Sequence, residues 1–275
     1  VNDIIISEIF ADPSPSVGLP EVEYVEIFNR TQKIIAFNSL VYQRGNTEVN
    51  LGDGFILPRQ YVILCAEEDV SEFESFGVVR GLPNFPSLSN TSDSLYLRAT
   101  NTNLQDFVFY SSEWYRDPDL AEGGYSLERI DPNIVACNIP ENWTASRDFK
   151  GGSPGSQNSV NGGISNIPPA ELTSISVLSP SLISLKFDRQ MDEASLVDVT
   201  RYELNNGIGN PLAATIVDAA QTEVLLLLPT DIEENRIYQI FTFGTFDCVG
   251  NEVMVEAEFG LPQPLEMGDV LINEI

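Results

Sequence analysis

The sequence predicts an all-β fold in two consecutive domains, joined by a short linker rich in Gly, Ser and Pro. Runs of β-branched and aromatic residues alternate with clusters of turn-forming residues along the whole chain. The composition changes at residues 151–169 (GGSPGSQNSVNGGISNIPP), which are nearly all Gly, Ser, Asn and Pro. The length of 275 residues suits roughly two domains of about 100 to 150 residues each.

The first domain is expected to span residues 1–160. Its predicted strands are, in order, IIISEIF, EYVEIF, FILPRQYVILC, SLYLRA, DFVFY and YSLERI. Short strands at this spacing are typical of a sandwich or barrel. One short helix is expected to begin at a capping-box-like pair, Asp69 and Glu72, and to end at Gly77.

The second domain is expected to span residues 164–262. Its predicted strands are LTSISVL, LISLKF, TEVLLLL, RIYQIFTF and EVMVEAEF, and its one helical candidate begins at Asp192. Residues 268–275 (GDVLINEI) align without a gap on residues 2–9 (NDIIISEI). Residues 263–275 are therefore interpreted as a linker and the first strand of a truncated next repeat.

The net charge of −27, from 41 acidic and 14 basic residues, limits the classes of partner. Such a field repels nucleic acid and anionic lipid, so neither is expected to bind. No apolar run reaches the roughly 18 residues of a spanning helix, so direct membrane insertion is not expected either. The acidic residues are interpreted either as a solvated exterior or as ligands for calcium.

Catalytic motifs are weak. Histidine is absent, which removes the commonest general base and the central member of a Ser/His/Asp triad. Residues 151–155 (GGSPG) match the pattern G-x-S-x-G, but Pro154 has no backbone N–H for an oxyanion hole. The motif is therefore interpreted as a loop, and no catalytic residue is predicted.

The three cysteines, Cys65, Cys137 and Cys248, lie at wide spacings that match neither a disulfide framework nor a zinc site. Cys65 follows YVIL and is interpreted as a small core residue. In an oxidising compartment, Cys65 with Cys137 is the only pairing within one domain to consider, and the sequence leaves open whether they are bonded.

Two acidic residues, Glu8 and Glu26, interrupt predicted apolar strands. An unpaired buried carboxylate would cost several kcal/mol, so each requires a partner. Arg129 interrupts the strand SLERI and is an available cation. The prediction is a structural charge network of Glu8, Glu26 and Arg129, and the alternative is a divalent-cation site built on the two glutamates.

Other oxygen ligands for a cation lie in predicted connections. None has the spacing of an EF-hand loop, and Asp or Asn beside Gly usually stabilises turns and helix starts. Asp12, Glu21 and Glu23 are candidates on or beside the first connection, whereas calcium binding in the second domain would require its two segments FDRQMD and FDCVGN to converge. The candidate metal ligands are Asp12, Glu21, Glu23, Asp188, Asp192, Asp247 and Asn251.

Short sequence motifs, taken in their order along the chain, resemble those of two known families. Residues 2–158 resemble a bacterial lamin-tail domain, through IIISEIFADP, EYVEIFN, FILPRQYVIL, PSLSNTSDSLYL, DFVFY, YSLERID, and NWTAS followed by GGSPGSQN. Residues 165–261 resemble the bacterial Ig-like modules of surface-layer and adhesion proteins, through LISLKFDRQMD, RYEL, IYQIF and FDCVGNEVM. The resemblance implies two consecutive immunoglobulin-like β-sandwiches.

Modules of these families are usually strung together in secreted or surface-displayed proteins. The leading hypothesis is therefore a non-catalytic extracellular segment that acts as a spacer, scaffold or adhesive element, and that needs no cofactor other than, in one reading, calcium. Its partners would be neighbouring repeats, or an extracellular protein or glycan. The alternative is a binding module that positions an extracellular hydrolase or nuclease, with Trp114 and Tyr115 as an exposed aromatic platform.

Overall fold

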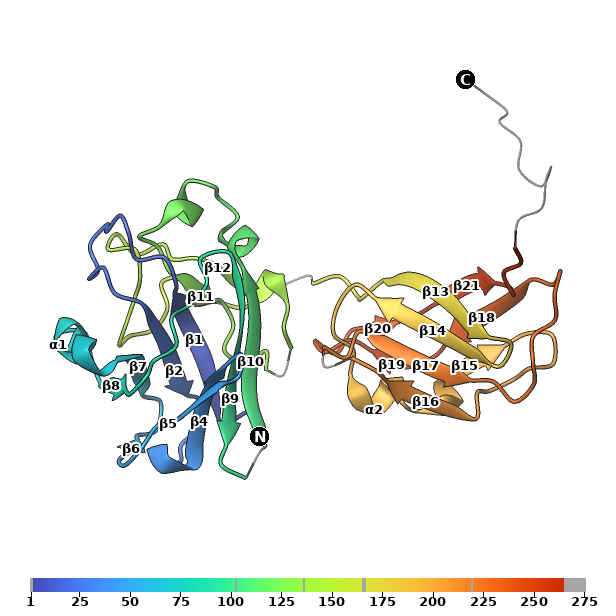
Figure 1. Ribbon diagram of the computed structural model, residues 1–275, viewed down its shortest axis with the longest axis horizontal. Helices are drawn as coiled ribbons and strands as arrows, with labels where there is room; N and C mark the ends of the chain where they lie inside the picture. Colours follow the sequence, from blue (N-terminus) through green and yellow to red (C-terminus); the bar gives the residue numbers. More distant parts are fainter. Residues whose placement is uncertain (1, 102, 136, 165–166, 219, 265–275) are drawn as a thin grey trace, which may run out of the picture. The chain divides into compact units, whose positions relative to one another are not determined.

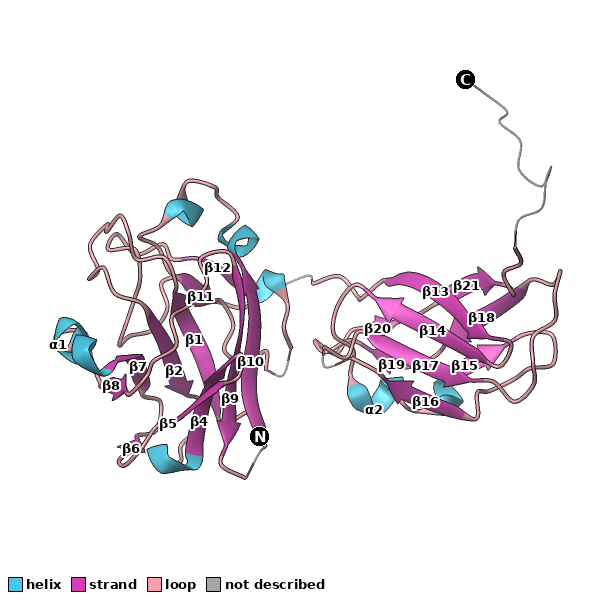
Figure 2. Ribbon diagram, in the orientation of Figure 1, coloured by secondary structure: helices cyan, strands magenta, loops and turns pink. Residues whose placement is uncertain are grey.

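The computed structural model describes residues 2–101, 103–135, 137–164, 167–218 and 220–264. The chain is mostly β-strand with a few short helices (Figures 1 and 2), which confirms the all-β prediction. It divides into two compact units, the first ending at Ile167 and the second beginning at Pro168, inside the predicted linker. No helix among the described residues is long and apolar enough to cross a membrane.

The first unit contains two large sheets that enclose one core, and a two-stranded sheet of β3 (Ile35–Ala36) and β6 (Phe55–Ile56). The six-stranded sheet has, in spatial order, β12 (Trp143–Ala145), β11 (Leu127–Arg129), β1 (Ile4–Phe10), β2 (Tyr24–Asn29), β7 (Tyr61–Ala66) and β8 (Val79–Leu82). The four-stranded sheet has β10 (Leu104–Ser111), β9 (Ser92–Ala99), β4 (Leu40–Arg44) and β5 (Thr47–Asn50). Its core combines side chains of both sheets, such as Val25 and Ile27 with Leu97 and Val108.

The six-stranded sheet is buried on both faces. Every residue of β2 is buried, although alternate side chains point to opposite faces. Val25 and Ile27 face the core between the sheets, whereas Tyr24 belongs to a second cluster with Cys65 and Phe73. That outer cluster is covered in part by helix α1 (Val70–Phe73), which contributes Phe73. The outer face can therefore hold polar groups that are shielded from water.

Several local predictions for the first unit are wrong. The run FILPRQYVILC is not one strand, since β6 (Phe55–Ile56) pairs with β3 (Ile35–Ala36) while β7 joins the six-stranded sheet. Pro58 lies between the two strands, where its missing N–H suits a break. Strand β5 is not among the predicted strands, and Asp69 makes no side-chain cap bond to α1.

The second unit also contains several sheets around one core, which includes Leu185, Leu226 and Ile240. The four-stranded sheet has, in spatial order, β13 (Leu172–Ser179), β14 (Leu182–Phe187), β17 (Glu223–Leu227) and β16 (Ala213–Ile216). The three-stranded sheet has β15 (Tyr202–Leu204), β18 (Tyr238–Thr242) and β21 (Glu256–Phe259). The two-stranded sheet has β19 (Thr245–Phe246) and β20 (Glu252–Val253). The predicted strand EVMVEAEF is thus divided between β20 and β21.

The remaining helices are short. Helix α2 (Glu193–Leu196) begins where predicted, because the Asp192 carboxylate accepts a hydrogen bond from the Ser195 N–H at 2.8 Å. The 3₁₀ turns are η1 (Phe37–Ser39), η2 (Glu67–Asp69), η3 (Ser112–Tyr115), η4 (Leu120–Glu122), η5 (Pro140–Asn142) and η6 (Val199–Arg201). The predicted restart of a repeat at residues 268–275 lies outside the described residues.

Candidate functional site

Three glutamates lie side by side on the outer face of the six-stranded sheet. Glu8 on β1 is directly opposite Glu26 on β2 and Glu128 on β11. Directly opposed residues of antiparallel strands point to the same face. All three side chains are fully buried, at 0% exposure. We call these three residues the glutamate cluster.

An irregularity in β1 brings Glu8 to this face. Ile6 is opposite Ile27, and an unbroken antiparallel register would then place Ser7 opposite Glu26. Instead the register shifts between Ile6 and Glu8, so that Glu8 is the partner of Glu26. The additional residue of this β-bulge turns Glu8 away from the core between the sheets.

Neutral donors satisfy the glutamate cluster. Hydroxyl and backbone N–H groups provide all the hydrogen bonds described for its carboxylates, and no Lys or Arg side chain takes part. Glu8 Oε1 accepts from Tyr24 OH (2.6 Å), Ser126 Oγ (2.6 Å) and Ser153 N (2.9 Å). Glu26 accepts from Ser7 Oγ (2.8 Å) and Gly155 N (2.6 Å). Glu128 accepts from Ser146 Oγ (2.7 Å), Ser153 Oγ (2.8 Å), Ser159 Oγ (2.7 Å) and Val160 N (3.1 Å).

Many of these donors belong to residues 151–160, a segment that we call the strap. Besides the bonds to the glutamates, Asn158 Nδ2 in the strap donates to the carbonyls of Ser7 (2.8 Å) and Arg129 (2.9 Å). The strap needs glycine for close approach, since a Cβ on Gly152 would lie 2.7 Å from Glu8 Oε1. The residues of the G-x-S-x-G pattern therefore form a loop that donates hydrogen bonds to buried carboxylates, which agrees with the interpretation of this motif as a loop.

Burial changes the acidity of the cluster. Burial, followed by the charge of Glu128, raises the pKa of Glu8 from 4.5 to about 7, although hydrogen bonds from Ser126, Tyr24 and Ser153 act to lower it. Burial and the neighbouring charge of Glu8 raise the pKa of Glu26 well above its ordinary value. The cluster therefore binds protons at a pH where exposed glutamates are ionised.

The predicted pairing of Arg129 with Glu8 and Glu26 is wrong. Arg129 follows Glu128 on β11, and successive strand residues point to opposite faces. Its guanidinium instead forms an ion pair with Asp106 of β10, with Nη2 2.5 Å from Oδ2, and donates through Nε to the Ile6 carbonyl at 2.8 Å. Sequence reasoning missed Asp106, although its place at the start of the apolar run DFVFY was a signal.

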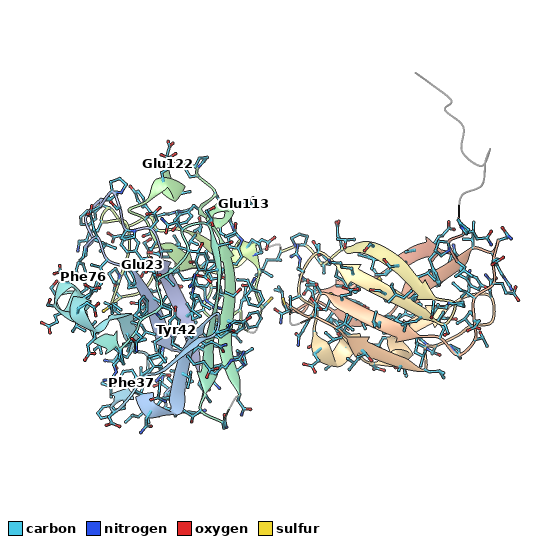
Figure 3. All side chains as sticks on the ribbon, viewed as in Figure 1. Glu23, Phe37, Tyr42, Phe76, Glu113 and Glu122 are labelled. Carbon is cyan, nitrogen blue, oxygen red and sulfur yellow. The ribbon has the colours of Figure 1, made fainter. Side chains whose placement is uncertain are left out.

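The predicted ligands Asp12, Glu21 and Glu23 of the first unit have structural contacts. Glu21 Oε1 accepts from Ser16 N at 3.1 Å, and Glu23 Oε2 accepts from Leu88 N at 3.0 Å. The Asp12 carbonyl accepts from Gly124 N at 2.8 Å. Glu23, labelled in Figure 3, is half-buried, and burial raises its pKa.

The predicted ligands of the second unit do converge, because Asp192 N donates to Phe246 O next to Asp247. Their carboxylates, however, accept hydrogen bonds from backbone N–H groups. Asp188 accepts from Glu171 N and Asp192 caps α2, while the buried Asp247 accepts from the backbone N–H groups of Ala170, Val249 and Asn251. Within the described ranges, no three His, Cys, Asp or Glu side chains lie close enough to hold a metal ion.

The predicted aromatic platform is wrong. Trp114 and Tyr115 are only 7% and 5% exposed, because η3 folds them inward. The ring of Trp114 lies 6.3 Å from that of Trp143, and Tyr115 OH donates to the Tyr125 carbonyl. Their spacing in SSEWYRDPD fits a buried turn as well as an exposed one, so the sequence alone did not distinguish the two.

Cys65 is a free thiol buried in the outer cluster of the six-stranded sheet. Burial, with a smaller contribution from nearby acidic groups, raises its pKa to about 11, which keeps it protonated. Its interpretation as a core residue is confirmed, and the pairing with Cys137 is not formed.

No protein-family model and no curated protein matches the chain. Two solved structures of the bacterial surface-layer protein SbsC, of its N-terminal part and of its domains 1–6, are similar over 36% of this chain, with 16% identity and a TM-score of 0.32. The matched part covers 24% and 14% of those chains. A likeness of this degree carries no argument about function.

Proposed function

We propose that this chain is a non-catalytic segment of a secreted or surface-displayed bacterial protein, in which it acts as a spacer, scaffold or adhesive element. The observation that carries the proposal is the state of the glutamate cluster. General acid–base chemistry needs a carboxyl group within hydrogen-bond reach of a substrate. The three carboxyl groups are at 0% exposure and are engaged by internal donors, so a substrate does not reach them.

Two further observations support a structural role. Each unit has its own core, and a composition break separates them, as in proteins that string modules together. The landmarks of the lamin-tail and bacterial Ig-like families occur in the order that such extracellular modules show. The alternative, a module that positions a hydrolase or nuclease, loses its main support because Trp114 and Tyr115 are buried.

The localisation is testable on intact cells of the source bacterium. An antibody raised against the 275-residue chain should label the surface of unpermeabilised cells, or detect the protein in the medium. Detection only after permeabilisation would contradict the proposal.

The absence of catalysis is testable on the chain itself. The purified chain and its Glu8→Gln variant are assayed with panels of glycoside, ester and phosphodiester substrates. The two proteins should show the same background rate. A rate above background that Glu8→Gln abolishes would show that the cluster is an active site.

A further inference from the structure

The strap is attached to the sheet mainly through carboxyl groups whose protonation can change. Its amides at Ser153, Gly155 and Val160 donate to Glu8, Glu26 and Glu128 respectively, one to each member of the cluster. The strap has no charged side chain of its own to compensate three carboxylates. Its attachment therefore depends on the charge that the cluster carries.

The surroundings of the cluster offer no compensating cation among the described residues. From β2 the cluster is faced by Tyr24, and Tyr61 of β7 lies near Glu26; both phenols are neutral at physiological pH, and burial raises their pKa further. Helix α1 contributes Phe73. Lys150, next to the strap, places its ammonium over the rings of Phe76 and Phe149, 5.6 Å from each centroid.

The geometry indicates where a proton would be held. Ser153 Oγ is 2.8 Å from Glu128 Oε1 and 3.5 Å from Glu8 Oε2. A hydroxyl has one hydrogen, so when Ser153 donates to Glu128 its lone pairs face Glu8. A proton on Glu8 Oε2 then completes a chain of donors from Glu8 through Ser153 to Glu128. Without that proton, Ser153 Oγ and Glu8 Oε2 face each other with no hydrogen between them.

We propose that the glutamate cluster and the strap form a proton-dependent latch, in which protonated glutamate holds residues 151–160 against the outer face of the six-stranded sheet. Loss of the proton loosens the strap, which is the first part of the Gly-, Ser- and Pro-rich segment at residues 151–169. The latch is a property of the first unit and does not depend on the proposed function.

The sign and the pH window follow from linkage. Glu8 has a pKa of about 7 in the folded chain and 4.5 when exposed, so the closed strap binds a proton more tightly than the open strap. The stabilisation is complete below about pH 4.5, declines as the pH rises, and is lost above about pH 7. If opening restores the ordinary value, one proton changes the closing equilibrium on the order of tenfold or more between pH 5 and pH 7.

Amide hydrogen exchange on the full chain tests the proposal. Protection of the Ser153, Gly155 and Val160 amides, corrected for intrinsic exchange rates at each pH, should fall on the order of tenfold from pH 5 to pH 7 and then level off. Amides of β17 in the second unit should show no such fall. Strap protection that is constant from pH 5 to pH 8 would overturn the proposal.

Variants sharpen the test. In Glu8→Gln the amide NH₂ at the Oε2 position donates to Ser153 as the protonated acid would, so the strap should stay protected at pH 8. Glu23→Gln is the matched control, because Glu23 is a partly buried glutamate with a raised pKa outside the cluster. It should leave the pH dependence of the strap unchanged. A Glu8→Gln strap that loosens with pH as the wild type does would contradict the latch.

A second measurement does not depend on the variants folding. Side-chain carboxyl ¹³C shifts of the wild-type chain should show at least one glutamate that titrates near pH 7 or above. Titration of every glutamate below about pH 5, the range of exposed groups, would overturn the proposal.

Discussion

Substitution at the buried ion pair between Arg129 and Asp106 tests most directly what stabilises the core of the first unit. Both side chains are nearly fully buried, with exposures of 2% and 1%. Asp106 Oδ2 also accepts the Ile6 N–H at 2.8 Å, so the carboxylate links the two sheets. Asp106→Asn keeps the shape of the side chain and removes its charge, which leaves the guanidinium buried without a counter-ion.

The expected loss is large. Removing one partner of a buried ion pair typically costs about 3 to 5 kcal/mol, because the remaining charge stays desolvated. For a unit of this size, that lowers the unfolding midpoint by roughly 6 to 20 °C. Arg129 also lies over the Trp143 ring, with its guanidinium carbon 4.9 Å from the centroid, so a displaced Arg129 would loosen a second contact.

Tryptophan fluorescence isolates the effect in the intact chain, since both tryptophans, Trp114 and Trp143, lie in the first unit. The matched control is Asp3→Asn, which breaks the exposed pair between Lys33 and Asp3 and should cost at most about 1 kcal/mol. If Asp106→Asn shifts the thermal or denaturant midpoint no more than Asp3→Asn does, the reasoning about this buried pair is refuted.

Three further predictions concern packing, turns and calcium. Gly152→Ala places a Cβ against Glu8 and should lower the free energy of unfolding of the first unit by about 1 to 3 kcal/mol in denaturant unfolding. The control Gly163→Ala, whose Cβ meets open space, should have little effect. Equal losses of stability in the two variants would count against close packing of the strap. Asp247→Ala leaves several backbone N–H groups without their acceptor. It should reduce the unfolding free energy of the second unit by at least roughly 1 to 3 kcal/mol, the cost of one unsatisfied buried group, and so lower its calorimetric midpoint. Asp231→Ala, at an exposed position, should not; an unchanged midpoint in Asp247→Ala would contradict the assigned role of Asp247. The unfolding midpoints of both units should be the same in millimolar calcium as in a chelator, because the candidate ligands accept internal hydrogen bonds or lie apart. A clear rise of either midpoint with calcium would show a site that the described residues do not reveal.

The sequence by itself determined the features that depend on neighbours along the chain. Alternation of β-rich runs with turn clusters is a local pattern, and it predicted the all-β class and most strands. The change of composition at residues 151–169 predicted the boundary that falls at Ile167. The Asp192 cap was predictable because its partner, Ser195, is three residues away. In each case the deciding contact is short in sequence.

The tertiary structure alone decided which charged groups meet. A single bulge between Ile6 and Glu8 sets the face on which Glu8 lies, and register in a sheet depends on the partner strand as well as on the strand itself. The partner of Arg129 comes from the opposite sheet, and the donors that satisfy Glu8 include Ser153, 145 residues away. Carboxylates, guanidinium and hydroxyls can pair in many combinations, so residue type says only that a buried charge needs a partner. Which partner it finds depends on strand parity and on the packing of distant segments.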